Sequence, residues 1–214
     1  MLAHNVLRNH ERGHSYIRSE NIEVLTHIYD EHINLAAWKK PCNTAAKSYA
    51  QFYLSHHSST QLQGALSNQH ARAWLNDKLP DHISKQAFIE DLTEVIEMFA
   101  YLFDLTSVGL RLTPLTKSMC PRLHVDKVQC RLVTTYAGVG TEWLDDNIGY
   151  RSQLKLGSTP TEPPSELIHS LDEQEVGLLK GTRWDESDTT GVIHRSPQAA
   201  QENPRLLLTL DILN

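Results

Sequence analysis

Two histidines and an aspartate are the residues of this chain best suited to hold a metal ion. His124 and Asp126 form a His-x-Asp pair just before a stretch with strand character, Val128 to Tyr136. Because alternate residues of an extended chain point to the same side, both side chains can face one cation. His194, in a second strand-like segment, is the candidate third ligand. Two imidazoles and one carboxylate on one side of an ion leave its other side open for substrate and oxygen.

An arginine that could bind a carboxylate follows these residues in the sequence. Arg205 comes after His194 with ten residues between them and opens the last strand-like run, LLLTLDIL. A buried guanidinium at this point would offer a planar, bidentate partner to a carboxylate. An ordinary ion pair with a nearby acid such as Asp211 is the alternative, and spacing alone does not decide between the two.

Three neighbours of the candidate ligands could also take part in the site. Cys120 is either a soft ligand that shifts the site toward zinc or a small buried residue. Glu142 and Trp143 follow the glycine-rich turn Gly138-Val-Gly140-Thr141 and could line the mouth of the site. An aromatic residue at this position could equally pack on the core.

Composition limits the class of protein. With 214 residues, 40% hydrophobic and 21% charged, the chain suits a soluble globular protein with a real core. A net charge of -6 argues against nucleic-acid binding, and no apolar run is long enough to span a membrane. Three scattered cysteines make no disulfide framework or Cys-x-x-Cys zinc site, and the first residues lack the apolar core of a secretory signal. We therefore expect a cytoplasmic protein.

The character of the chain changes near Asp104. Before this point we expect a flexible arm over 1–19 and a mainly helical supporting layer over 20–105. Within this layer the sequence predicts a strand over 33–38 and helices over 20–30, from a cap at Asn43 to His56, over 61–79 and, most clearly, over 84–104 with Ser84 as its cap.

Beyond this point, short apolar runs separated by turn residues predict strands over 108–112, 128–136, 175–179, 192–193 and 206–213. Several short strands without long helices favour a sandwich or barrel over alternating strand and helix units. The polar stretch 145–174, interrupted by glycine and proline, is predicted to be a lid or a mobile insertion in this barrel.

The order of these motifs resembles that of the iron(II)/2-oxoglutarate-dependent dioxygenases, in their prolyl-hydroxylase-like branch. There, His-x-Asp precedes a strand ending in Tyr, a glycine-rich turn, a Gly-Asp-x-Leu-like strand, the distal His and a basic residue about ten positions on. The corresponding positions here, within 106–214, are Tyr136, Gly138 to Thr141, Glu175 to Leu178, His194 and Arg205. The chain departs from the pattern in having Glu175-Val-Gly in place of Gly-Asp, and Arg195 directly after the distal His.

The resemblance implies an α+β fold whose residues 106–214 form a double-stranded β-helix, a jelly-roll or cupin-like barrel, supported by N-terminal helices. It implies Fe(II) held by His124, Asp126 and His194, with 2-oxoglutarate as cosubstrate. Arg205 would anchor the C5 carboxylate of 2-oxoglutarate, and Tyr136 would be a second hydroxyl contact. Arg195 could compete as the carboxylate binder or simply face solvent.

A longer set of motifs, MCPRLHVD with TTYAGVGTEWL, LLKG and HRSP, is similar to an uncharacterised bacterial family of unknown function that is associated with zinc-responsive gene neighbourhoods. Two alternatives to a dioxygenase therefore stay open. One is a zinc- or metal-binding module for metal homeostasis, without catalysis. The other is a cupin-type zinc isomerase or hydrolase that uses the same ligands. The sequence indicates neither the substrate nor the oligomeric state.

Overall fold

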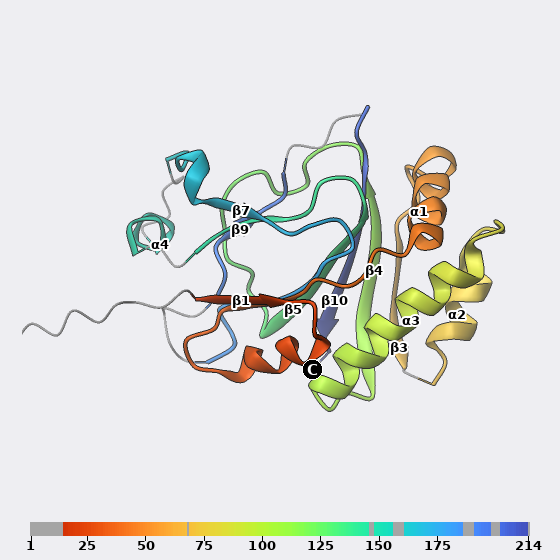
Figure 1. Cartoon of the computed structure of the whole chain (residues 1–214), viewed down its shortest axis with the longest axis horizontal. Coiled ribbons are helices and arrows are strands. Elements are labelled where there is room, and N and C mark those ends of the chain that lie inside the picture. Colours follow the sequence, from red (N-terminus) through yellow and green to blue (C-terminus); the bar gives the residue numbers. More distant parts are fainter. Residues whose placement is uncertain are drawn as a thin grey trace, which may run out of the picture.

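A computed structural model describes residues 15–67, 69–145, 148–155, 161–185, 191–197 and 202–213 of the chain (Figure 1). Its elements, in chain order, are β1 (Tyr16–Ser19), η1 (Ile22–Tyr29), β2 (Leu35–Trp38), α1 (Thr44–His56), β3 (Leu62–Ser67), α2 (Ala71–Lys78), α3 (Lys85–Leu102), β4 (Ser107–Leu115), β5 (Cys130–Ala137), β6 (Glu142–Leu144), α4 (Ile148–Lys155), η2 (Ser165–Leu167), β7 (Ile168–Ser170), β8 (Val176–Lys180), β9 (His194–Arg195) and β10 (Arg205–Ile212), where η marks a 3-10 helix. None of the described helices is long and apolar enough to cross a membrane.

The described strands form two sheets that face each other. The major sheet has seven strands in the order β1-β2-β8-β5-β10-β4-β3, and the minor sheet has three in the order β7-β6-β9. A backbone bridge between His124 and His194 adds the segment around His124 to the minor sheet beside β9. From β4 onward the chain passes repeatedly between the sheets, and Val133 and Leu179 of the major sheet pack against Trp143 of the minor sheet. This is the double-stranded β-helix, or jelly roll, that the sequence predicted.

Three helices cover the outer face of the major sheet (Figure 1). The predicted long helix is α3, and its apolar residues Phe88, Leu92 and Phe99 are fully buried against this face. Ser84 precedes α3 but makes no capping hydrogen bond with its side chain. Asn43 caps α1 as predicted, because its side-chain oxygen accepts a hydrogen bond from the Ala46 N–H at 3.0 Å.

The N-terminal half contributes more strand than the sequence predicted. The end of the predicted arm is β1, which pairs in parallel with β2; residues 1–14 of the arm lie outside the described part. The helix predicted over 61–79 is wrong, since β3 pairs with β4 and only α2 is helical. The edge of β4 explains the difference, because it pairs with 62–67 as a strand. Gly64 then lets α2 pack closely on β3, since a Cβ atom at this position would lie 2.9 Å from the Trp74 ring. The region predicted as a helix over 20–30 is the 3-10 helix η1.

In the C-terminal half, the strands predicted over 108–112, 128–136, 175–179 and 206–213 correspond to β4, β5, β8 and β10, with ends shifted by a few residues. The strand predicted over 192–193 is wrong in position, because β9 begins directly after it, at His194. The sequence missed β6 and β7, which have three residues each and too short a pattern to detect. The predicted insertion 145–174 contains α4, η2 and β7, so its last part belongs to the minor sheet. Its mobility stays a prediction.

Candidate metal centre

The structure brings His124, Asp126 and His194 together at one end of the barrel. Asp126 Oδ1 lies 3.5 Å from His124 Nε2, and Asp126 Oδ2 lies 3.4 Å from His194 Nε2. One donor atom from each residue lies within 4.8 Å of the other two. Among the described residues, no other group of three His, Cys, Asp or Glu side chains comes together in this way.

Backbone hydrogen bonds place the two imidazoles side by side. The His124 N–H donates to the His194 carbonyl at 3.0 Å, and the His194 N–H donates back to the His124 carbonyl at 2.9 Å. In each ring Nδ1 lies near a carbonyl oxygen two residues earlier, that of Arg122 at 2.9 Å and that of Val192 at 3.0 Å. A carbonyl only accepts, so Nδ1 carries a proton in each ring, and Nε2, the nitrogen that would bind a metal ion, faces Asp126.

Asp126 is held ionised by its surroundings. Burial raises the pKa of its carboxyl group, but hydrogen bonds with His124 and His194 and the charge of Arg131 outweigh burial and bring the pKa well below its usual range. Arg131 Nη1 donates to Asp126 Oδ2 at 2.6 Å. Because Arg131 occupies one side of this carboxylate, Asp126 is suited to give a metal ion one oxygen atom, which leaves more positions open for other ligands.

The donor set fits a divalent transition metal. Two neutral imidazoles and one carboxylate suit Fe(II) and Zn(II) alike, and the residues alone do not select between them.

Cys120 is exposed and lies outside the metal-ligand group. Both predictions for Cys120, a soft ligand and a small buried residue, are therefore wrong.

Arg205 lies inside the barrel without an acidic partner. Its side chain is 1% exposed, Nη1 donates to Ser196 Oγ at 2.7 Å, and Nη2 donates to Thr135 Oγ1 at 3.2 Å. Its Nε has no hydrogen-bond partner among the described residues, and none of their carboxylates forms an ion pair with it. Burial lowers the pKa of Arg205 to about 10, although Glu142 opposes this. The alternative pair with Asp211 does not form, because Asp211 binds Arg111 and Arg131.

Tyr136 was wrongly predicted to contact the cosubstrate. Alternate residues of β5 face opposite sides of the major sheet, and Thr135 faces Arg205 in the barrel. Tyr136 therefore points to the helical layer, where its ring lies 4.9 Å from that of Phe88 and its hydroxyl donates to Asp91 Oδ1 at 2.8 Å. Its role is to join the sheet to α3.

Arg195, Glu142 and Trp143 are also occupied within the fold. Arg195 Nε donates to Glu142 Oε2 at 2.6 Å and its Nη1 donates to Glu162 at 2.9 Å, so neither prediction for Arg195 holds: it faces two carboxylates and needs no third. Glu142 is engaged by this ion pair.

Trp143 packs in the barrel core, which was the second of its two predicted roles. The rings of Trp143 and His169 stack at 4.5 Å.

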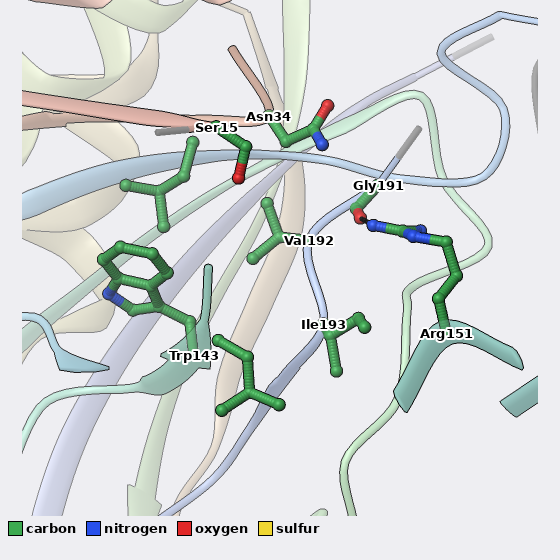
Figure 2. Close-up of a pocket in the computed structure, with 9 residues that line it drawn as sticks. Ser15, Asn34, Trp143, Arg151, Gly191, Val192 and Ile193 are labelled. Atoms are coloured by element: carbon green, nitrogen blue, oxygen red, sulfur yellow. Dashed lines mark hydrogen bonds between the residues drawn. The ribbon is translucent and has the colours of Figure 1, made fainter. Parts of the chain in front are cut away.

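The insertion is attached to the segments that carry the metal ligands. Leu123, Val125 and Ile193, which flank His124 and His194 in sequence, pack with Tyr150 and Leu154 of α4. Figure 2 shows Arg151 of α4 reaching a small pocket beside β2, where its Nη2 donates to the Gly191 carbonyl at 2.9 Å. This pocket contains none of the three ligands, but Val192 and Ile193 in its wall lead directly into His194.

Sequence reasoning missed Arg131, Thr135 and Ser196, which orient Asp126 and Arg205. A signal for two of them was present in β5, where Arg131 and Thr135 are polar residues four apart, on the same side of the strand. No signal marks Ser196, because a single serine after a short strand is common in any loop.

Solved structures resemble the fold of this chain. JOX2, determined in complex with 2OG, Fe and JA, has a TM-score of 0.50 at 10% identity, over 92% of this chain and 73% of that one. The rice dioxygenase for auxin oxidation has a TM-score of 0.47 at 14% identity, over 84% of this chain and 73% of that one. No curated protein matches the chain in sequence. A family described as "Protein of unknown function (DUF1826)" matches residues 19–211, nearly the whole of the chain, which therefore belongs to that family.

Proposed function

We propose that this protein is an iron(II)/2-oxoglutarate-dependent oxygenase that hydroxylates or demethylates a substrate. The observation that carries the proposal is Arg205, a buried arginine with no carboxylate partner among the described residues, in the same barrel as the metal-ligand group. Burying a cation without a counter-ion costs free energy, so such a residue is best explained by an anion that binds to it. The fold shared with a 2OG- and Fe-containing structure supports the choice of anion.

Each residue of the site has a distinct task in this proposal. His124, Asp126 and His194 hold the metal, and the carbonyls of Arg122 and Val192 fix the orientation of the imidazoles. Arg205 would form a charge-assisted pair with the distal carboxylate of 2-oxoglutarate, and its buried Nε, which has no partner among the described residues, is a donor still available to a ligand.

Bound iron(II), with 2-oxoglutarate and oxygen, supplies the oxidising chemistry that acts on a C–H bond of the substrate. Val133, Leu179 and Trp143 form a buried apolar cluster between the sheets, in the same barrel as the metal-ligand group. Such a cluster would help to exclude water from the interior side of the site. The three cysteines are unpaired, which supports assigning this chemistry to the reducing cytoplasm.

The test is to purify the protein without oxygen, load it with Fe(II), and measure both the binding of 2-oxoglutarate and its oxidation to succinate. We expect binding and slow turnover in the wild type, with both lost in Asp126→Asn, which removes an anionic ligand. A protein that holds Zn(II) or Fe(II) at one equivalent but does not bind millimolar 2-oxoglutarate would contradict the proposal. The non-catalytic metal-binding module would then be the better account, and zinc-dependent hydrolase or isomerase activity would have to be tested next.

A further inference from the structure

A line of ion pairs runs from the metal-ligand group to a partly exposed arginine. Arg131 joins Asp126 to Asp211, since its Nη1 lies 2.6 Å from Asp126 Oδ2 and its Nε lies 2.6 Å from Asp211 Oδ1. Arg111 Nη2 lies 2.6 Å from Asp211 Oδ2, the same oxygen that Arg131 Nη2 approaches at 3.1 Å. Two guanidinium groups therefore share one carboxylate beside the metal-ligand group.

Arg111 is the member of this line that can bind another group. Its side chain is 41% exposed, whereas those of Arg131 and Asp211 are 19% and 20% exposed. Its described hydrogen bonds occupy Nη2 and, weakly at 3.4 Å to Thr209 Oγ1, Nε. A guanidinium has five N–H donors, so several of them still face solvent.

The charges around the metal-ligand group leave an excess of cations. The two arginines Arg111 and Arg131 balance the two aspartates Asp126 and Asp211. A divalent metal ion would bring two positive charges and 2-oxoglutarate two negative ones, so these also balance. Arg195 with Glu142 and Glu162 adds one negative charge. Arg205 and the exposed side chains of Arg122 and Lys127, which form no ion pair with a described acid, outnumber it and leave an excess of positive charge. Segment 122–131 contains three basic residues and one acid, Asp126, in a chain with a net charge of -6.

We propose that the open end of the metal site binds an anionic group of the substrate, a carboxylate or a phosphate, and that Arg111 is the residue that recognises it. This inference adds to the function proposed above. It rests on that function in one respect only, namely that the anionic ligand is called a substrate. Arg131 holds Asp211 in place, and Asp211 in turn fixes the guanidinium of Arg111 with part of its donors toward solvent. A fixed guanidinium loses little entropy when it binds an oxyanion, which favours recognition.

The test uses full-length protein loaded with Zn(II), which is redox-inert, and three probes of similar size: phenylacetate, phenyl phosphate and the neutral phenylacetamide. Calorimetric titration should show that the wild type binds at least one anion more tightly than the amide. Arg111→Gln should weaken anion binding about 3- to 10-fold, a modest factor because water screens a partly exposed arginine. Arg111→Lys, which keeps the charge, should retain part of the preference. Which of the two anions binds more tightly identifies the group.

Arg72 provides the matched control, because it is an exposed arginine, 3.8 Å from Glu90, on α2 in the helical layer that covers the outer face of the major sheet. Arg72→Gln should leave all three affinities unchanged. Zinc content and 2-oxoglutarate affinity are measured in every variant. Equal anion binding by wild type and Arg111→Gln at equal zinc content would overturn the proposal, and so would equal binding of anion and amide. If the wild type fails to bind 2-oxoglutarate, the oxygenase function fails, but the anion titrations still decide the role of Arg111.

Discussion

Replacing Arg205 by methionine would separate a ligand-binding role from a structural one. Burial lowers the pKa of Arg205 from its ordinary value to about 10, and at about 1.36 kcal/mol per pKa unit this shift is about 3 kcal/mol against the buried cation. Because the pKa is lowered in the folded protein, this cost is present in full below about pH 10 and disappears as the pH rises toward the pKa of arginine in the unfolded chain. The hydrogen bonds from Arg205 to the hydroxyl groups of Ser196 and Thr135 stabilise the folded protein by about 1 kcal/mol each. Without ligand, Arg205→Met should therefore be about 1 kcal/mol more stable than wild type.

The same substitution should weaken 2-oxoglutarate binding about 10- to 150-fold, the value of a charge-assisted bond worth about 1.5–3 kcal/mol. Urea unfolding at pH 7 measures the change in the free energy of unfolding, and calorimetric titration of the Zn(II)-loaded protein measures the change in affinity for 2-oxoglutarate. Arg195→Met is the control, because Arg195 has two carboxylate partners; it should lose stability and keep its affinity for 2-oxoglutarate. If Arg205→Met instead lost 3 kcal/mol or more, as when a buried ion pair is broken, and bound 2-oxoglutarate normally, the reasoning would be refuted.

Three further predictions concern the supporting residues. Arg131→Gln removes the partner of Asp126 Oδ2 and should weaken Zn(II) binding about 10- to 100-fold in a chelator competition, and an unchanged affinity would argue against its orienting role. Tyr136→Phe leaves the buried Asp91 short of a donor and should cost about 1–3 kcal/mol in urea unfolding without changing 2-oxoglutarate affinity. Leu154→Ala should loosen α4, so amide hydrogen exchange should become faster around His124 but not in β10; equal exchange in both proteins would contradict the packing argument.

The metal-ligand group could be predicted from the sequence because its signals are local. His124 and Asp126 are two residues apart, and His194 lies in a recognisable strand-like run. The helix α3 was equally clear, since its apolar residues recur at helical spacing over five turns. Such patterns depend on neighbours in the chain and need no knowledge of the tertiary structure.

What the sequence did not reveal depends on distant partners. The side of β5 that carries Tyr136 is decided by the helices packed on that strand, and the Asp91 that binds its hydroxyl is 45 residues away. In the same way, Arg195 could be excluded as a carboxylate binder only once Glu142 and Glu162 were found beside it. Strand β3 resembles a helix in composition and becomes a strand because β4 offers it a free edge.

The position of β10 has a consequence for the biosynthesis of this protein. Every other strand of the major sheet precedes β10 in the chain, yet β10 lies between β4 and β5 and pairs with both. During synthesis, the edge of β4 and the edge of β5 that will pair with β10 therefore stay unpaired until β10 has been made. Unpaired strand edges are prone to pair with other chains. The pairing of β10 with β4 joins residues about a hundred positions apart, such as Arg205 and Leu115 or Ile212 and Val108. Closure of the barrel should therefore be slow. The strand that closes the barrel also carries Arg205, so Arg205 reaches its place only when folding is complete. Under the function proposed above, an incompletely folded chain would therefore bind no 2-oxoglutarate.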